Sequence, residues 1–356
     1  MISGNKLFKK EVKKDTISYK PWGSYKDKNV YLFKLENTNG AFVELMNYGA
    51  TIANIVVPDK QGKLGTVVLG FPSLEEYVND QYYIGSTIGR FANRIGSAKF
   101  TLDGVTHYLE KNDNANTNHG GVNGFNSRVF DFIINAESLS FTLTSKDGEG
   151  GYPGNLQFKV TYSWNDNNEL AIRYEAVSDK KTVLNFTNHA YFNLSSEQGD
   201  ILDHEVTIHA EAMLSTDRDY IPNGLIVPLN DNVFNQRVIR ESLTISDNKV
   251  KGSNNYYILE RKDKNKNSHA CTLIERASGR KLEIFTTYPG VQFYTGDYLG
   301  VNSLSDRSKK FKPFDGLCLE CQHYPDSPNH ANFPSTTIDA GKVYDECIVF
   351  KFSTIP

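Results

Sequence analysis

The sequence predicts an all-β protein, a large antiparallel β-sandwich with very few short helices. Three observations support this prediction. Apolar and polar residues alternate along many stretches, turn-forming residues separate these stretches, and strand-favouring aromatic residues are abundant, with 21 Phe and 20 Tyr against 3 Met. No stretch shows the strands and long helices in alternation that βαβ units require. We therefore expect a single sandwich domain over residues 1–356.

The first local signals are a short helix and a tight hairpin. In Ser73-Leu74-Glu75-Glu76, the Ser and the second Glu match a capping box, which predicts a helix of about two turns. The run from Phe100 to Tyr108 has Asp103-Gly104 at its centre. Because this dipeptide tolerates positive φ at both turn positions, we expect a hairpin closed by a type I′ turn.

Longer strands are predicted in the second half of the chain. Residues 156–176 alternate on both sides of the Asn-rich turn 165–168, and residues 271–285 form a similar pattern. Residues 348–352 alternate again and predict a terminal strand. The Lys- and Asn-rich tract 261–267 lies between these patterns and is expected to be a solvated loop.

Charge and composition exclude several classes of function. The chain carries 39 Lys and Arg against 42 Asp and Glu, a formal charge of −3, which argues against a nucleic-acid binder or a polybasic membrane binder. No window approaches the roughly 18 apolar residues of a membrane span, and the start lacks the apolar region of a signal peptide. The 4 cysteines are too few for a disulfide scaffold. We expect a cytoplasmic protein.

Polar residues cluster in a few segments that otherwise have buried-looking sequences. These segments are the candidate site: Gly89 to Ile95, Asn118 to Gly121, Phe186 to Leu194, Pro289 to Gly296 and Leu319 to Asp326. If the third is one continuous strand, Asn185, Thr187, His189 and Tyr191 share a polar face opposite an apolar one. His189 on such a face suits general acid or base catalysis, although a hydrogen-bonded structural His is an equal alternative.

Glu320 lies in a strand-like run of residues that are otherwise suited to burial. A buried carboxylate must be paired, hydrogen-bonded or functional, because burial of a bare charge costs several kcal/mol. A structural salt bridge is the alternative. Cys318 and Cys321 have the spacing of a metal or redox motif, but on a strand they point to opposite faces and no second such pair exists. We therefore expect no metal site.

Further polar residues suit the binding of a ligand rich in oxygen atoms. His119 precedes Gly120-Gly121, which permits close approach of a ligand to the backbone. Asn93 and Arg94 supply fixed donors, although an Arg in a salt bridge is the commoner case. The phosphate-binding loop of NTPases, the dinucleotide fingerprint and the serine nucleophile elbow are all absent from the sequence. Hydride transfer, NTP use and α/β-hydrolase chemistry thus lack support.

From about Phe42 to Phe352 the chain resembles the aldose 1-epimerase family, also called galactose mutarotases. The five candidate-site segments carry this resemblance in order along the chain. Further matching motifs are Asn47-Tyr48-Gly49-Ala50-Thr51, Val57-Pro58-Asp59, Val68-Leu69-Gly70-Phe71 and the run from Asp147 to Gly154. The resemblance implies the large sandwich of that family and an enzyme that needs neither a metal nor an organic cofactor.

The resemblance also implies roles for individual residues. Glu320 matches the base that takes the proton from the anomeric hydroxyl, and His189 matches the acid that protonates the ring oxygen of the sugar. Opening, rotation and closure of the ring then interconvert the α and β anomers of a free hexose, with glucose and galactose the expected substrates. Further residues match positions that hold the oxygens of the sugar: Asn93, Arg94, His119, Tyr191 and Gln292. Tyr191 and Phe293 offer aromatic surface for packing against a sugar ring.

Three positions depart from the pattern of the family. Asn254, in Gly252-Ser253-Asn254-Asn255-Tyr256, stands where an Asp commonly binds sugar hydroxyls. An amide lacks the charge-assisted hydrogen bond of a carboxylate, so Asn254 puts the preferred sugar in question. Phe130 replaces a common Trp, and Phe234-Asn235-Gln236-Arg237 replaces a common Phe-Asp-Phe-Arg.

Two rival interpretations remain. One is a carbohydrate-binding sandwich without catalysis, and the other is an epimerase for a different monosaccharide or for a sugar phosphate. A sugar phosphate would favour a basic cluster, of which Arg94 is the one candidate near the site. We expect a monomer or weak dimer whose partner is a small sugar, without nucleic-acid or membrane binding. The near-neutral charge suits an uncharged ligand.

Overall fold

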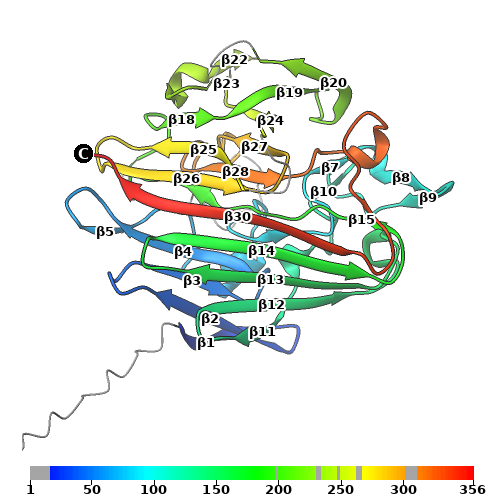
Figure 1. The fold of residues 1–356 in the computed structure, drawn as a ribbon, viewed down its shortest axis with the longest axis horizontal. Coiled ribbons are helices and arrows are strands. Elements are labelled where there is room, and N and C mark those ends of the chain that lie inside the picture. Colours follow the sequence, from blue (N-terminus) through cyan, green and yellow to red (C-terminus); the bar gives the residue numbers. More distant parts are fainter. Residues whose placement is uncertain (1–16, 197–198, 230–233, 247–248, 262–266, 301–310) are drawn as a thin grey trace, which may run out of the picture.

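The computed structural model describes residues 17–196, 199–229, 234–246, 249–261, 267–300 and 311–356. Across these ranges the strands form three main sheets of nine, six and five strands, together with several two-stranded ladders (Figure 1). Within the same ranges, α1 (Leu74–Val78) is the only α-helix. The prediction of an all-β sandwich with few short helices is confirmed.

The nine-stranded sheet crosses the front of the molecule in Figure 1. Neighbouring strands in it pair antiparallel throughout. In spatial order its strands are β11 (Asp131–Ile134), β12 (Ser138–Ser145), β13 (Leu156–Trp164), β14 (Glu169–Ser178), β30 (Val343–Thr354), β26 (Arg280–Thr286), β25 (Ser268–Ile274), β18 (Glu205–Ile208) and β21 (Arg237–Val238).

The other two sheets are also antiparallel. The six-stranded sheet contains β17 (Tyr191–Phe192), β28 (Leu317–Gln322), β27 (Gly290–Tyr294), β24 (Asn254–Leu259), β19 (Ala210–Thr216) and β20 (Pro222–Pro228). The five-stranded sheet contains β1 (Ile17–Tyr25), β2 (Lys28–Glu36), β3 (Phe42–Met46), β4 (Thr51–Pro58) and β5 (Leu64–Thr66). The two-stranded ladders are β6 (Thr87–Ile88) with β16 (Thr187–Asn188), β7 (Arg94–Ile95) with β10 (Thr117–Asn118), β8 (Lys99–Leu102) with β9 (Val105–Tyr108), β15 (Thr182–Val183) with β29 (Thr337–Ile338), and β22 (Thr244–Ser246) with β23 (Lys249–Lys251).

One hydrophobic core joins the three sheets. It includes Phe33 of β2, Phe141 of β12, Tyr174 of β14, Phe293 of β27 and Leu319 of β28, all of them buried. Aromatic rings fill much of this core, which accounts for part of the surplus of Phe and Tyr. The inward faces of the sheets are thereby fixed, and the residues that alternate with them on β27 and β28 face away from this core.

The predicted hairpins are confirmed. β13 and β14 bury every second residue, and the Asn165 side chain accepts two backbone N–H groups in the turn between them. In the β8–β9 hairpin, Asp103 and Gly104 have φ values of 50° and 79°, as a type I′ turn requires. The 271–285 hairpin is β25–β26, and residues 348–352 lie in β30. Of the tract 261–267, residues 262–266 lie outside the described residues.

The helix is shorter than the capping box suggested. Ser73 accepts a hydrogen bond from the Glu76 amide at 3.4 Å, as expected of an N-cap, but α1 has 5 residues and its C-cap is Asn79. Among the described residues, none of the helices has the length and apolar character needed to cross a bilayer. All four cysteines, which lie within the described ranges, are free.

The condition that the segment around His189 is one continuous strand is not met. The segment breaks into β16, which pairs with β6, and β17, which pairs with β28. The break arises because the Asn188 amide and the His189 backbone bond to the loop before β6, at Gly85 O and Ser86 O. His189 therefore lies at a kink between two sheets rather than on the face of one strand.

Candidate active site

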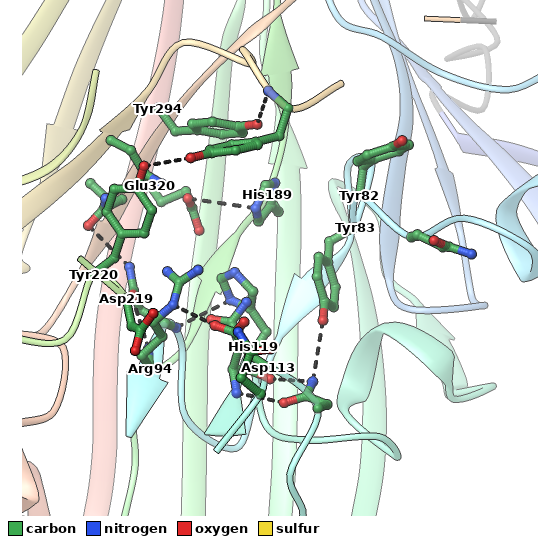
Figure 2. Close-up of a pocket in the computed structure, with 18 of the residues that line it drawn as sticks. Tyr82, Tyr83, Arg94, Asp113, His119, His189, Asp219, Tyr220, Tyr294 and Glu320 are labelled. Carbon is green, nitrogen blue, oxygen red and sulfur yellow. Dashed lines mark hydrogen bonds and ion pairs between the residues drawn. The ribbon is translucent and has the colours of Figure 1, made fainter. Parts of the chain in front are cut away.

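The structure contains a polar pocket of about 450 Å³ beside the six-stranded sheet (Figure 2). All eight residues that the sequence predicted for the site line this pocket: Asn93, Arg94, His119, His189, Tyr191, Asn254, Gln292 and Glu320. They come from segments more than 200 residues apart in the chain. The fold thus brings the predicted residues together in one place.

Strand register places the sheet-borne residues. Gln292 of β27 and Glu320 of β28 are directly paired, so their side chains emerge on the same face of the sheet. Asn254 of β24 is paired with Tyr294, which follows Gln292 by two residues and also lines the pocket. The prediction that Phe293 packs against a sugar ring is wrong. It alternates with these two positions and is fully buried in the main core.

Of the polar face predicted for residues 185–191, half reaches the pocket. His189 and Tyr191 line it. The Thr187 hydroxyl instead donates to Cys321 O at 2.8 Å, and the Asn185 side chain bonds to Ala92 O and to His323. These two residues hold the kinked segment in place.

His119 enters the pocket from a loop with left-handed backbone at three successive positions. His119, Gly120 and Gly121 have φ values of 51°, 87° and 90°. A Cβ at Gly120 would lie 2.0 Å from the Gly89 carbonyl oxygen. Only glycine fits at this position, but the close approach is to the backbone of the chain itself rather than to a ligand.

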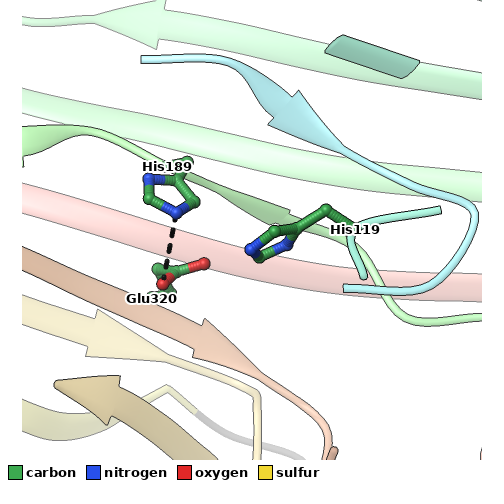
Figure 3. Close-up of side chains that lie close together, drawn as sticks. All are labelled: His119, His189 and Glu320. Carbon is green, nitrogen blue, oxygen red and sulfur yellow. Dashed lines mark ion pairs between the residues drawn. The ribbon is translucent and has the colours of Figure 1, made fainter. Parts of the chain in front are cut away.

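His189 and Glu320, which both line the pocket, face one another (Figure 3). The distance from His189 Nε2 to Glu320 Oε1 is 3.7 Å, and the side chains are 6% and 3% exposed. Glu320 Oε2 has no hydrogen-bond partner among the described residues. Within the part of the chain that the structure describes, Glu320 forms no salt bridge with Lys or Arg, so a structural ion pair does not account for its burial.

Burial moves the pKa values of these two groups in opposite directions. It raises the pKa of Glu320 to about 8, an effect that the nearby Arg94 charge partly offsets. It also lowers the pKa of His189 to about 4. Between these values the pair carries one proton in total. A pair that holds one proton is able to release it at one atom and accept another elsewhere.

His119 is held as a neutral hydrogen-bond donor. Its Nδ1 accepts the Asn93 backbone N–H at 3.2 Å, and burial together with the nearby His189 and Arg94 lowers its pKa well below the usual value. The neutral ring therefore carries its proton on Nε2. Two imidazoles and a carboxylate, with candidate ligand atoms within 4.8 Å, could hold a transition metal. Metal ligation by His119 Nε2 would require an imidazolate, so the arrangement favours donation to a polar ligand.

Three side-chain amides form a row with a fixed direction. Asn93 Oδ1 accepts the Arg94 backbone N–H at 2.8 Å, so Asn93 Nδ2 is the donor to Gln292 Oε1 at 3.1 Å. Gln292 Nε2 in turn donates to Asn254 Oδ1 at 2.7 Å. Asn254 consequently has its Nδ2 donor left for a ligand, where the family commonly offers a carboxylate.

Arg94 is both paired and part of the pocket wall. Its Nε is 2.7 Å from Asp113 Oδ2, and its guanidinium lies 5.3 Å from the ring centre of Tyr220. Tyr220 in turn shares a 2.7 Å hydrogen bond with Tyr298. The salt bridge expected as the commoner alternative is thus present, and it fixes the position of the guanidinium.

The pocket is also lined by residues that were not predicted from the sequence: Gln81, Tyr82, Tyr83, Asn112, Asp113, Asn114, Arg218, Asp219, Tyr220, Tyr294 and Tyr298. Tyr294 had a usable signal, because it alternates with Gln292 on the same strand. The loops that contain the others show no periodic pattern, so no signal in the sequence singles them out.

The fold and this site define an all-β protein with one acid–base pocket in its described part. A family model described as aldose 1-epimerase matches residues 31–351. Galactose mutarotase of Mus musculus is 40% identical over 314 residues, which cover 87% of this chain and 91% of the relative. Aldose 1-epimerase of Escherichia coli K12 is 34% identical over 331 residues, which cover 90% and 94%.

Solved structures agree. A GalM/aldose epimerase homologue from C. elegans has a TM-score of 0.80 at 29% identity, covering 91% of this chain and 98% of its own. Galactose 1-epimerase from Lactobacillus acidophilus has a TM-score of 0.78 at 25% identity, covering 95% and 98%. The chain belongs to the aldose 1-epimerase family, and the resemblance seen in the sequence is confirmed. It is an enzyme of the isomerase class.

Of the three departures from the family pattern, one lies in the pocket. Phe130 is 2% exposed and packs near Phe125 and Phe158 in the main core. Asn235 and Gln236, the two residues that differ in the run Phe234-Asn235-Gln236-Arg237, are exposed. None of these three residues lines the pocket, whereas Asn254 does.

Proposed function

We propose that the chain interconverts the α and β anomers of a free hexose, glucose or galactose, with Glu320 as base and His189 as acid. The 3.7 Å approach of His189 and Glu320, buried in a polar pocket, is the observation that carries this proposal. The galactose mutarotase and aldose 1-epimerase names of the relatives support the choice of reaction.

In the proposed mechanism, the sugar lies with its anomeric hydroxyl at Glu320 and its ring oxygen at His189. Glu320 takes the hydroxyl proton while the C1–O5 bond breaks, and His189 gives its proton to O5. C1 becomes an aldehyde, the C1–C2 bond rotates, and O5 attacks the other face of the carbonyl. Both protons return during closure, so the enzyme ends as it began.

Proton counting supports this scheme. The pair holds one proton in total, on His189 before ring opening and on Glu320 after it. In the free protein the raised pKa of Glu320 and the lowered pKa of His189 place the proton on Glu320. A bound cyclic sugar donates to the carboxylate and accepts from the imidazole, and both contacts favour the charged arrangement. In this scheme, the position of one proton, on Glu320 or on His189, distinguishes the states of the pair.

The remaining site residues hold the sugar. His119 Nε2–H and Asn254 Nδ2 supply neutral donors, while Arg94 supplies a charged donor fixed by Asp113. Tyr191 presents its ring beside that of His189, with centroids 5.1 Å apart. Such a set of donors around a partly aromatic wall suits a ligand that carries many hydroxyl groups.

Polarimetry with freshly dissolved α-glucose and α-galactose tests the proposal, together with a panel of other aldoses and a hexose 6-phosphate. We expect rotation to reach its final value faster with the protein than without it for at least one of the two hexoses. Binding measured by calorimetry without acceleration of any sugar would instead support a carbohydrate-binding protein. Acceleration confined to the phosphate or to another monosaccharide would overturn the hexose assignment.

A further inference from the structure

The ring of Tyr83 lies against both imidazoles of the pocket (Figure 2). Its centre is 4.7 Å from that of His119 and 5.8 Å from that of His189. The two imidazoles are 5.1 Å apart and stand at 77° to one another. Within the described ranges, no further aromatic ring contacts both of them. Tyr83, His119 and His189 therefore form a closed triangle of rings in the pocket wall.

The backbone holds Tyr83 in a conformation that bulky side chains rarely adopt. Its φ is 60°, in the left-handed region. The amides of Tyr82 and Ile84 donate to the Asp80 carboxylate at 2.8 and 2.6 Å. The Ser86 amide donates to Tyr83 O at 3.0 Å. Such strained positions persist where surrounding contacts hold them, and they are frequent at functional sites.

The same loop is bonded to the backbone of His189 on both sides. Gly85 N–H donates to His189 O, and His189 N–H donates to Ser86 O, both at 2.9 Å. Because these bonds join the loop to the kink between β16 and β17, Tyr83 and His189 belong to one hydrogen-bonded unit.

The hydroxyl of Tyr83 is linked to the segment that contains His119. Asn112 Nδ2 donates to the Tyr83 hydroxyl oxygen at 3.4 Å and to Asn118 O at 2.8 Å. The Asn118 N–H donates in return to Asn112 Oδ1 at 2.7 Å. Since Asn118 precedes His119, Tyr83 connects the two segments that supply the imidazoles.

We propose that Tyr83 is a positioning residue whose ring fixes the two imidazoles relative to one another and shields them from water. The inference rests on the proposed function, in which His189 exchanges a proton with the sugar and His119 donates a hydrogen bond to it. A misplacement of about 1 Å in such a site can cost about 100-fold in rate. Although both imidazoles line the pocket, His119 is 6% and His189 is 4% exposed, which agrees with a shield over them.

Shielding by Tyr83 has a consequence for protonation. Burial lowers the pKa of His189 to about 4 and that of His119 well below the ordinary 6.5. Loss of the ring would admit water, so both pKa values should rise toward 6.5. When His189 and Glu320 are both protonated, no base is left to take the proton from the sugar. The acid limb of the rate profile should therefore move to higher pH when the ring is lost.

The other groups that face His189 stay in place when Tyr83 is replaced. They are Glu320 and Cys318 of β28, Tyr191 of β17 and His119, and the charged groups around them are Arg94, Asp113 and Asp80. The guanidinium among these groups is held by its own carboxylate partner at 2.7 Å. A change in the titration of His189 would therefore report on the ring of Tyr83.

Kinetics with two substitutions test the inference. Tyr83→Asn removes the ring, and because Asn is among the residues that tolerate a left-handed backbone, the variant should fold. We expect kcat to fall by about 10- to 100-fold and the acid limb of kcat/KM to rise by about one pH unit or more. Tyr83→Phe keeps the ring and loses one weak hydrogen bond, so its kcat should stay within about threefold of wild type.

Tyr25→Asn is the matched control. Tyr25 of β1 is also half-buried and packs edge-on to Tyr48, but it lies outside the pocket. The same exchange at this position should leave both kcat and the pH profile as in wild type.

Nitrogen NMR of the histidine rings reads the shielding without reference to activity. The signals are assigned by their loss in His119→Gln and His189→Gln, and the amide spectrum of each variant confirms its folded state. We expect both rings to titrate about one pH unit or more higher in Tyr83→Asn than in wild type, and Tyr83→Phe to match wild type. Wild-type kcat or an unchanged titration in folded Tyr83→Asn would overturn the inference.

The inference and the proposed function fail in different ways. If wild type accelerates sugar interconversion and Glu320→Gln does not, while Tyr83→Asn keeps its kcat and titration, the inference alone is overturned. If wild type accelerates no sugar, the proposed function is overturned and with it the catalytic role given to Tyr83. The titration would then still confirm or refute the shielding of the imidazoles by the ring.

Discussion

The two faces of strand β28 are equally buried but chemically opposite. Leu317, Leu319 and Cys321 point into the main hydrophobic core. Glu320 points into the pocket and is 3% exposed. Six consecutive residues thus combine a stabilising surface with a costly one.

The difference between the two faces shows where the chain buries a group that destabilises the fold. Burial of Leu319 stabilises the fold through loss of apolar surface to water. Burial of Glu320 does the reverse, because it raises the pKa of the carboxyl group to about 8 and leaves Oε2 without a partner among the described residues. Such unfavourable burial persists where it serves a reaction. The contrast predicts that substitutions on the two faces affect different measurements.

The largest effect is expected from Glu320→Gln, which removes the proposed base but keeps the shape of the side chain. Loss of a general base typically lowers kcat by about 10²- to 10⁴-fold. The melting temperature should stay the same or rise, because an unpaired buried carboxyl group is removed. Polarimetry and calorimetry of the same preparation measure both quantities. A variant with wild-type kcat would break the comparison, since Glu320 would then have no catalytic role.

How much of the site could be predicted from the sequence alone differs from residue to residue. Alternation located the long hairpins, and a carboxylate in a strand-like run suited to burial, now β28, singled out Glu320. His189 was singled out by its residue type, but its backbone conformation was not predicted. The kink between β16 and β17 depends on contacts with the loop at Gly85 and Ser86. Hydrogen bonds between segments far apart in the chain leave no local pattern.

The same limit explains the residues that were missed. Tyr83 and Tyr220 reach the pocket from irregular loops, whose paths are set by tertiary contacts. Phe293 was misplaced because the site segment was treated as a unit, whereas on a strand Gln292 and Phe293 necessarily point to opposite faces. The sequence thus identified the segments of the site better than the direction of each side chain.

Leu319→Ala tests the core face of the same strand. Truncation of a buried Leu leaves a cavity and typically costs about 2–5 kcal/mol of stability. We expect a loss in this range by denaturant unfolding, with kcat of the folded protein within about threefold of wild type, because the change is on the opposite side of the backbone from the pocket. Stability equal to wild type would contradict the assignment of Leu319 to the main core.

The dependence of stability on pH sharpens the contrast further. The pKa of Glu320 is raised from its ordinary 4.5 to about 8, so between these values the folded protein holds a proton that the unfolded chain has lost. Stability from this group therefore falls as pH rises through that window, by on the order of a few kcal/mol in total. The lowered pKa of His189 acts oppositely, raising stability as pH rises from about 4 to 6.5.

The difference in unfolding free energy between wild type and Glu320→Gln isolates the contribution of Glu320. Glu320→Gln retains His189 but cannot titrate at position 320, so the difference in unfolding free energy between it and wild type should grow in favour of the variant from about pH 4.5 to pH 8. Above that range the difference should be constant. Denaturant unfolding at several pH values measures it. A difference independent of pH would show that Glu320 titrates normally in the folded protein.

The smallest effect is expected from Asn254→Asp, which alters what the pocket face offers to a sugar. The direction of the amide row leaves Asn254 Nδ2 as a donor, whereas an Asp would keep an acceptor for Gln292 Nε2 and present a second acceptor to the ligand. Sugars whose hydroxyl donates at this position should gain about tenfold in kcat/KM, as expected for a charge-assisted hydrogen bond.

Deoxyfluoro sugars separate a change of hydrogen bonding from a change of charge. Fluorine can accept but not donate, so at the hydroxyl that faces position 254 the wild-type donor should tolerate fluorine while the Asp variant rejects it. Asn114→Asp, which adds the same charge at another residue of the pocket wall, should leave the order of preference unchanged. If both variants shift kcat/KM equally across the panel, the effect is one of charge alone and Asn254 does not select the sugar. A shift confined to Asn254→Asp and to one hydroxyl position would identify the oxygen that this residue reads.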